Sequence, residues 1–156
     1  MPFILRYPRE VKPGSVNDDM VLNLDFAPLF LDLAGAPIPE AFQGRSFLPL
    51  LRGQTPADWR QAMYYRYWMH NTSDHHVPAH YGIRTRKWKL IYYYGKPLGM
   101  KGANGPETPP EWELFDLRRD PREMKNVYGD PANRALAGKL ERQLATLQAA
   151  CGDSPA

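Results

Sequence analysis

Apolar and polar residues alternate along two neighbouring arms within residues 80–94, and this alternation predicts a β-hairpin that turns near Arg86. In the register that pairs Ile83 with Leu90, one face is apolar and carries Tyr81, Ile83, Thr85, Trp88, Leu90 and Tyr92. The other face carries His80, Gly82, Arg84, Lys89, Ile91 and Tyr93. Such a hairpin packs its apolar face on a core and presents its polar face either to solvent or to a ligand.

The segments around the hairpin predict two more strands and a final helix. Residues 62–68 and 112–117 are rich in aromatic and aliphatic side chains, as strands are. Asp130 is a good helix N-cap and is followed by Pro131, which suits a first helical position. The expected helix has an apolar stripe of Leu136, Leu140, Leu144 and Leu147 and ends near Gly152. Strands grouped before a helix predict an α+β fold, a four-stranded antiparallel sheet with the C-terminal helix packed against it.

The first part of the chain has a different pattern. Residues 3–5 form a short continuous apolar run, which is typical of a strand buried on both faces of a parallel sheet. Asp25 is positioned to cap a helix over residues 26–34, which ends at Gly35. A strand, a loop and a helix in this order resemble the closing piece of a large α/β layer. We therefore expect one domain over residues 1–53 and a second over residues 54–150.

Composition narrows the function classes. The chain has 156 residues, is 43% hydrophobic and carries a net charge of +3, with its basic residues spread along the sequence. This distribution does not predict nucleic-acid binding, because such proteins cluster Lys and Arg on one surface. No apolar run reaches the length of about 18 residues that a membrane helix needs. The single cysteine, Cys151, excludes an internal disulfide, and no sequence signal indicates a cellular location.

Candidate chemistry concentrates in one stretch, since all four histidines lie within residues 70–80. Their spacing matches no structural zinc pattern, and no cysteine or carboxylate stands at a matching distance. A Gly-x-Ser-x-Gly nucleophile motif is absent, and Cys151 lies close to the terminus at the expected end of a helix. The residues alone therefore predict neither a metal site nor a catalytic group in this chain.

Several segments, in order, resemble the late part of a sulfatase of the alkaline-phosphatase-like superfamily. They are Pro2-Phe-Ile-Leu-Arg-Tyr-Pro, Asn23-Leu-Asp-Phe-Ala-Pro-Leu-Phe-Leu-Asp-Leu-Ala-Gly, Gln43-Gly-Arg-Ser-Phe-Leu-Pro-Leu-Leu-Arg-Gly, His80-Tyr-Gly-Ile-Arg-Thr-Arg-Lys-Trp-Lys-Leu-Ile and Glu113-Leu-Phe-Asp-Leu-Arg-Arg-Asp-Pro-Arg-Glu-Met-Lys-Asn. The resemblance is to arylsulfatases and N-sulfoglucosamine sulfohydrolases and extends to about Gln148. It implies that residues 1–53 end an α/β catalytic domain and that the rest is the C-terminal subdomain.

The sequence departs from this family in its catalytic parts. The family's formylglycine nucleophile arises in a Cys/Ser-x-Pro-x-Arg motif, and this motif is absent. The paired Asp residues that hold the family's calcium also have no counterpart, and a hard cation needs about six oxygen ligands. The resemblance therefore implies that the parent enzyme uses calcium and formylglycine, whereas this chain holds no cofactor and is inactive by itself.

The resemblance implies a role for the chain as one wall of the substrate cleft of a sulfuric ester hydrolase. The expected partner is a sulfated saccharide or another sulfate ester. His80 is the main candidate for contacting it, His75 and His76 come next, and Arg84 is a weaker candidate. Arg84 has an alternative role as a buried partner of Asp116. A non-catalytic module that binds anions or sulfated sugars, or a purely structural domain, are the alternative functions. The apolar residues of the first 35 positions also predict a homo-oligomer.

Overall fold

The computed structural model describes residues 3–103 and 105–154. The chain forms two compact units, Met1–Arg60 and Gln61–Ala156, each with its own core. The second unit contains the sheet and the long helix, and the first is built from short helices and connecting segments.

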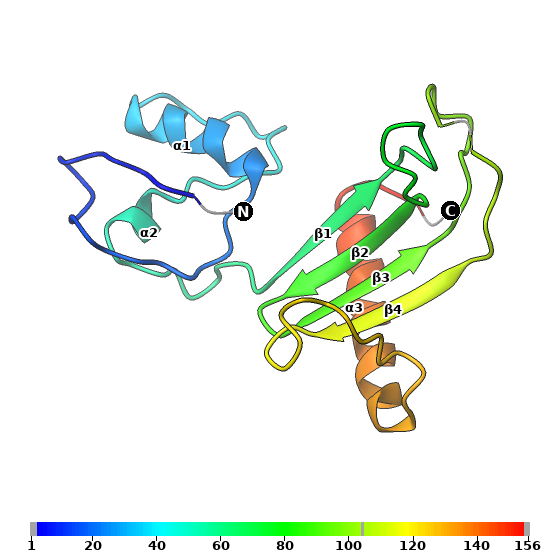
Figure 1. Cartoon of the computed structure of the whole chain (residues 1–156). Coiled ribbons are helices and arrows are strands. Elements are labelled where there is room, and N and C mark those ends of the chain that lie inside the picture. Colours follow the sequence, from blue (N-terminus) through cyan, green and yellow to red (C-terminus); the bar gives the residue numbers. More distant parts are fainter. Residues whose placement is uncertain (1–2, 104, 155–156) are drawn as a thin grey trace. The chain divides into compact units, whose positions relative to one another are not determined.

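The second unit is an antiparallel sheet with a helix across one face (Figure 1). Its strands are β1 (Ala62–Tyr67), β2 (His80–Thr85), β3 (Trp88–Tyr93) and β4 (Glu111–Asp116). Neighbours in sequence are neighbours in the sheet, in the order β1-β2-β3-β4. The long helix is α3 (Arg134–Ala150), preceded by the 3-10 turn η2 (Pro131–Asn133). The α+β fold predicted for this part is confirmed.

The hairpin of β2 and β3 has the predicted register, with Ile83 opposite Leu90 and Tyr81 opposite Tyr92. These four side chains belong to the core cluster that includes α3, or pack against it, so the predicted apolar face is the covered one. The Thr85 hydroxyl closes the turn, because it accepts a hydrogen bond from the Trp88 backbone N–H over 2.9 Å. A side chain thus supplies the turn contact that a type I′ Asn-Gly sequence would otherwise provide.

Helix α3 also follows its sequence pattern. The Asp130 carboxylate accepts a hydrogen bond from the Ala132 backbone N–H over 2.9 Å and so caps η2, the 3-10 turn that leads into α3. Leu140 and Leu144 are buried against the sheet, and Gly152 has the positive φ (70°) that commonly ends a helix. Burial of this stripe removes the apolar side of the helix from water.

The first unit contains the 3-10 turn η1 (Asn23–Asp25) and the helices α1 (Phe26–Leu33) and α2 (Leu48–Leu51). Its core consists of Leu29, Phe47, Leu48, Leu50 and Trp59. The predicted strand at residues 3–5 is wrong, because the described part of this unit contains no strand and Ile4 is 92% exposed. A parallel strand needs hydrogen-bonded neighbours. Phe3 instead packs edge-on against the rings of Phe26 and Phe47.

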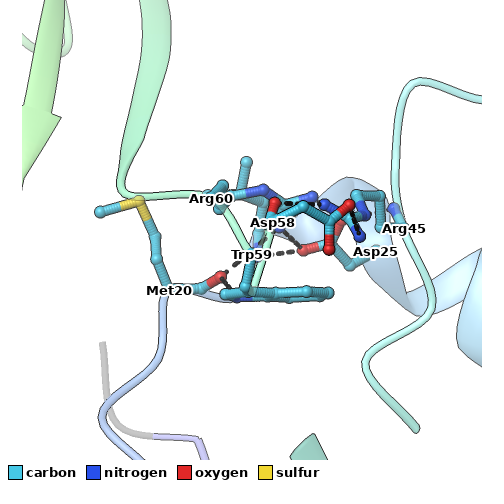
Figure 2. A network of polar contacts seen from close by, with 7 residues as sticks. Met20, Asp25, Arg45, Asp58, Trp59 and Arg60 are labelled. Carbon is cyan, nitrogen blue, oxygen red and sulfur yellow. Dashed lines mark hydrogen bonds and ion pairs between the residues drawn. The ribbon is translucent and has the colours of Figure 1, made fainter. Parts of the chain in front are cut away.

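The prediction of Asp25 as a helix cap is also wrong, since its side chain makes no cap hydrogen bond to α1. The carboxylate is fully buried, and it contacts Arg45 and Arg60, which are far from it in the sequence (Figure 2). It accepts hydrogen bonds from the backbone N–H groups of Leu22 (2.7 Å) and Arg45 (2.9 Å). Both terminal nitrogens of the Arg60 guanidinium bind it as well, one of them over 2.8 Å. Asp25 therefore organises the interior of the first unit.

Trp59 extends this network (Figure 2). Its indole Nε1–H donates to the Met20 carbonyl over 3.1 Å, and the guanidinium groups of Arg45 and Arg60 each lie 5.0 Å from the centre of its ring. Cations stacked on an indole attract its electron-rich face. These contacts tie Trp59 and Arg60 to the first unit.

Candidate functional site

The sheet face opposite α3 carries most of the polar residues that the sequence singled out; we call it the outer face. The strand register arranges it in three rows: Tyr67-His80-Tyr93-Glu111, Tyr65-Gly82-Ile91-Glu113 and Met63-Arg84-Lys89-Phe115. Gly82 is required in the middle row, because a Cβ there would lie 2.8 Å from the Tyr65 hydroxyl oxygen and 2.5 Å from the Leu90 carbonyl oxygen. The outer face therefore carries aromatic rings, with Arg84 and Lys89 in one end row and Glu111 and Glu113 on the edge strand β4.

His80 lies among aromatic rings at one end of this face. Its ring centre is 5.3 Å from that of Tyr67 and 4.9 Å from that of Tyr93. Its Nδ1–H donates to the Pro78 carbonyl over 2.8 Å, which leaves Nε2 as the hydrogen-bond acceptor of a neutral ring. Burial, aided by the charge of Lys89, lowers the pKa of His80 below its ordinary value. His80 is therefore a neutral acceptor near pH 7 and not a cation.

A hollow of about 490 Å³ opens beside this end of the outer face. Its lining comprises His76, Val77, Pro78, Tyr93, Thr108, Pro109, Pro110, Glu111 and Glu113. One wall is the loop before β2, the other is the loop before β4, and Tyr93 connects the hollow to the ring of His80. The structure thus brings His76 and Tyr93 to one hollow, and His80 packs against Tyr93 without lining the hollow itself.

The other predicted site residues lie elsewhere. His75 is exposed in the same loop as His76 but does not line the hollow. Arg84 is exposed on β2, four residues from His80 and so about 13 Å along the strand. The alternative role of Arg84 as a buried partner of Asp116 is wrong, since Asp116 instead accepts hydrogen bonds from the backbone N–H groups of Arg118 and Arg119.

Lys89, which shares the outer face with Arg84, forms an ion pair with Glu123 over 2.5 Å. Both side chains are about a quarter exposed, so water screens the pair only in part. This contact holds the segment after β4 against the outer face.

His70 is a residue whose position the sequence did not reveal. It stands among the other histidines in the chain, yet its side chain is fully buried and both ring nitrogens have partners. Neither residue type nor spacing distinguishes a buried histidine from one that presents its ring to a ligand.

The described residues do not fit a calcium or other metal site. Within residues 3–103 and 105–154, no three His, Cys, Asp or Glu side chains gather in a way that would hold a metal ion. In the same part of the chain, no helix is both long and apolar enough to cross a membrane.

Residues 1–150 match the model of the N-sulphoglucosamine sulphohydrolase C-terminal family. The chain belongs to this family. It is 42% identical to the N-acetylglucosamine-6-O-sulfatase of Bacteroides thetaiotaomicron over 149 residues, which cover 94% of this chain and 24% of the relative. The Ulvan-active sulfatase of Formosa agariphila is 29% identical over 98% of the chain and 34% of its own length. The sulfatase resemblance seen in the sequence is therefore confirmed.

Solved structures lead to the same family. A protein solved in complex with its substrate D-glucosamine-2-N,6-O-disulfate superposes with a TM-score of 0.79 and 41% identity. The match covers 92% of this sulfatase domain and 27% of that chain. A phosphonate monoester hydrolase from Silicibacter pomeroyi superposes with a TM-score of 0.69 and 27% identity, over 88% of this chain and 27% of its own. The domain thus spans about a quarter to a third of the relatives it matches.

Proposed function

We propose that this chain is the C-terminal part of a sulfuric ester hydrolase that acts on a sulfated saccharide, and that it forms one wall of the substrate cleft. The observation that carries the proposal is a hollow in a sulfatase C-terminal domain that His76 and Tyr93 line, with the ring of His80 packed against Tyr93. A similar protein was solved with a sulfated glucosamine as its substrate.

The chemistry of the hollow suits the sugar rather than the sulfate group. Glu111 and Glu113 line it, and their carboxylates repel an anion but accept hydrogen bonds from hydroxyl groups. Tyr93 offers an aromatic ring with a polar tip, and neutral His80 offers an acceptor at Nε2. We therefore assign hydroxyl and ring contacts to this wall, with Arg84 and His75 as more distant contacts for longer or anionic parts of the saccharide.

The first unit exposes apolar side chains that would need a cover in a complete enzyme. Ile4 is 92% exposed and Phe30 on α1 is 64% exposed. Covering a side chain of this size is worth about 1.5–3 kcal/mol. We propose that this surface faces the catalytic part of the enzyme.

The chain by itself is expected to hydrolyse no sulfate ester. It has no Cys/Ser-x-Pro-x-Arg sequence for a formylglycine nucleophile, and its described residues gather no metal ligands. An aryl sulfate assay of the purified chain with added calcium tests this expectation. Turnover above that of heat-inactivated protein would contradict it.

A chimera tests the role of the wall. Residues 1–150 replace the matching segment of the Bacteroides thetaiotaomicron N-acetylglucosamine-6-O-sulfatase, which is 42% identical over this region. We expect the chimera to hydrolyse N-acetylglucosamine 6-sulfate. His80→Ala should then lower kcat/KM for the saccharide about 10-fold, the effect of losing one good hydrogen bond, and should affect a small aryl sulfate less.

The control is Lys87→Ala, which changes an exposed residue at the hairpin turn and should leave both substrates unaffected. Equal losses on both substrates would place His80 at the sulfate group. No loss on either substrate would make His80 a structural residue and refute its place in the wall.

A further inference from the structure

We propose that His70 is a positioning residue that ties together the two loops forming the hollow. This inference rests on the proposed function, because it concerns the saccharide subsite assigned there. One loop, residues 68–79, supplies His76, Val77 and Pro78, and the other, residues 94–110, supplies Thr108, Pro109 and Pro110. His70 belongs to the first loop and reaches the second.

The hydrogen bonds of the buried ring define its protonation. The Ala79 backbone N–H can only donate, and it lies 3.0 Å from Nδ1, so Nδ1 carries no proton. The Pro106 carbonyl can only accept, and it lies 2.8 Å from Nε2, so Nε2 carries the proton. His70 is therefore neutral and uses both nitrogens to hold backbone groups.

These two backbone groups stand next to the lining of the hollow. Ala79 directly follows Pro78 in one wall, and Pro106 stands two residues before Thr108 in the other. The link to Ala79 fixes the shape of the first loop, whereas the link to Pro106 joins the first loop to the second. The Nε2 hydrogen bond is thus the shorter of two side-chain links between the loops, since the Asn71 amide Nδ2 also donates to the Pro106 carbonyl over 3.5 Å.

Close backbone packing between the loops is a second, independent observation. A Cβ at Gly105 would lie 2.2 Å from the Cβ of Asn71, so only glycine permits this approach. Asn71 itself has a φ of 43° and donates its backbone N–H to the Val77 carbonyl over 2.9 Å, which closes the first loop. The loops are therefore built to meet at His70, beside the residues that line the hollow.

Two substitutions separate the functions of the two nitrogens. In His70→Asn, the side-chain oxygen reaches the position of Nδ1 and keeps the bond to Ala79, but the 2.8 Å bond to Pro106 is lost and only the 3.5 Å bond from Asn71 remains. In His70→Gln, the side-chain amide reaches the position of Nε2 and can donate to Pro106. A purely structural need for a buried ring would make both variants equally poor.

To test this, the full chain is titrated with D-glucosamine 6-sulfate and, separately, with D-glucosamine. Binding is detected by NMR as shifts of the backbone amides of His76 and Val77 in one wall and of Thr108 and Glu111 in the other. In the unsubstituted chain, both walls should shift with a common Kd. His70→Asn should raise this Kd on the order of tenfold, the cost of a lost buried hydrogen bond, whereas His70→Gln should stay within about threefold.

The outcomes separate this inference from the proposed function. If the unsubstituted chain binds saccharide and both variants bind equally well or equally poorly, the positioning role is refuted and the saccharide subsite stands. If the unsubstituted chain binds neither ligand, the saccharide subsite is refuted. In that case, the hydrogen-exchange rate of the Thr108 amide, which donates to the Gly95 carbonyl over 2.9 Å, tests whether His70 couples the two loops. Faster exchange in His70→Asn alone supports the coupling, and equal exchange in both variants overturns it.

Discussion

Replacing Asp25 with alanine removes the carboxylate on which four hydrogen bonds of the first unit converge. The Arg60 side chain, only 14% exposed, would then carry a charge without its buried partner. Loss of one member of a buried ion pair costs about 3–5 kcal/mol, because the remaining charge stays away from water. We expect a destabilisation of this size for Asp25→Ala.

The magnitude distinguishes two roles of this residue. If Asp25 acted as a helix cap, as its sequence position suggests, alanine would cost about 1 kcal/mol. The unit has about 60 residues, and small folds of this size have little free energy of unfolding to lose. We therefore expect Asp25→Ala to unfold the first unit under conditions in which the second unit remains folded.

The assay is urea unfolding of the full chain at 25 °C, followed by NMR of the Trp59 indole Nε1–H. This proton reports on the first unit alone, since it donates to the Met20 carbonyl. Asp25→Asn, which keeps the shape of the side chain, provides a milder variant whose transition remains measurable. The matched control is Asp58→Asn, because Asp58 forms an ion pair with Arg45 at the surface, where such pairs contribute about 0–1 kcal/mol.

The reasoning is refuted if Asp25→Ala and Asp58→Asn destabilise the Trp59 transition by the same small amount. Such a result would show that the buried carboxylate contributes no more than a surface charge. Loss of the Trp88 and Trp112 signals together with that of Trp59 would instead show that the two units unfold as one.

Three further predictions concern the pH dependence, the ion pair between Asp153 near the C-terminus and Arg66 on β1, and self-association. Burial lowers the pKa of His80 below about 6.5, so between pH 5 and pH 7 the unfolded chain binds more protons at this residue than the folded unit does. The free energy of unfolding of the second unit should therefore rise from pH 5 to pH 7. Urea unfolding of His80→Phe should show a smaller rise. Asp153→Ala should destabilise the second unit by about 3 kcal/mol in thermal unfolding, since it leaves the buried guanidinium of Arg66 without its ion-pair partner; an unchanged Tm would contradict this. The isolated chain should self-associate at micromolar concentration through the exposed apolar surface of the first unit, and Phe30→Ser should shift light scattering toward the monomer; a monomeric unsubstituted chain would count against this prediction.

Local patterns were sufficient to predict most of the second unit. The alternation around Ile83 and Leu90 identified both the hairpin and its covered face, and Asp130 marked the start of the last helical segment. These features depend on neighbours in sequence, where side-chain periodicity and capping are directly visible. Consecutive strands lie side by side in the sheet, which is the commonest arrangement along a chain, even though only β2 and β3 are joined by a tight turn.

Contacts between distant positions were not predictable in the same way. The partner of Asp25 is Arg60, 35 residues away, and the acceptor for the His70 ring is Pro106, 36 residues away. An aspartate before a helix has the same local signature whether it caps that helix or enters the core. For the same reason, four clustered histidines did not reveal that His70 is buried while His76 lines a hollow.

The C-terminal contact has a practical consequence for choosing where to cut the chain. The family match ends at residue 150, whereas the Asp153 carboxylate accepts hydrogen bonds from the Tyr64 hydroxyl and from the Arg66 guanidinium, the latter over 2.7 Å. A boundary drawn from homology would thus keep the whole of α3 and discard the partner of a buried cation on β1. A version ending at residue 150 should express less soluble protein than one ending at residue 156, although both contain the whole range that the family model matches.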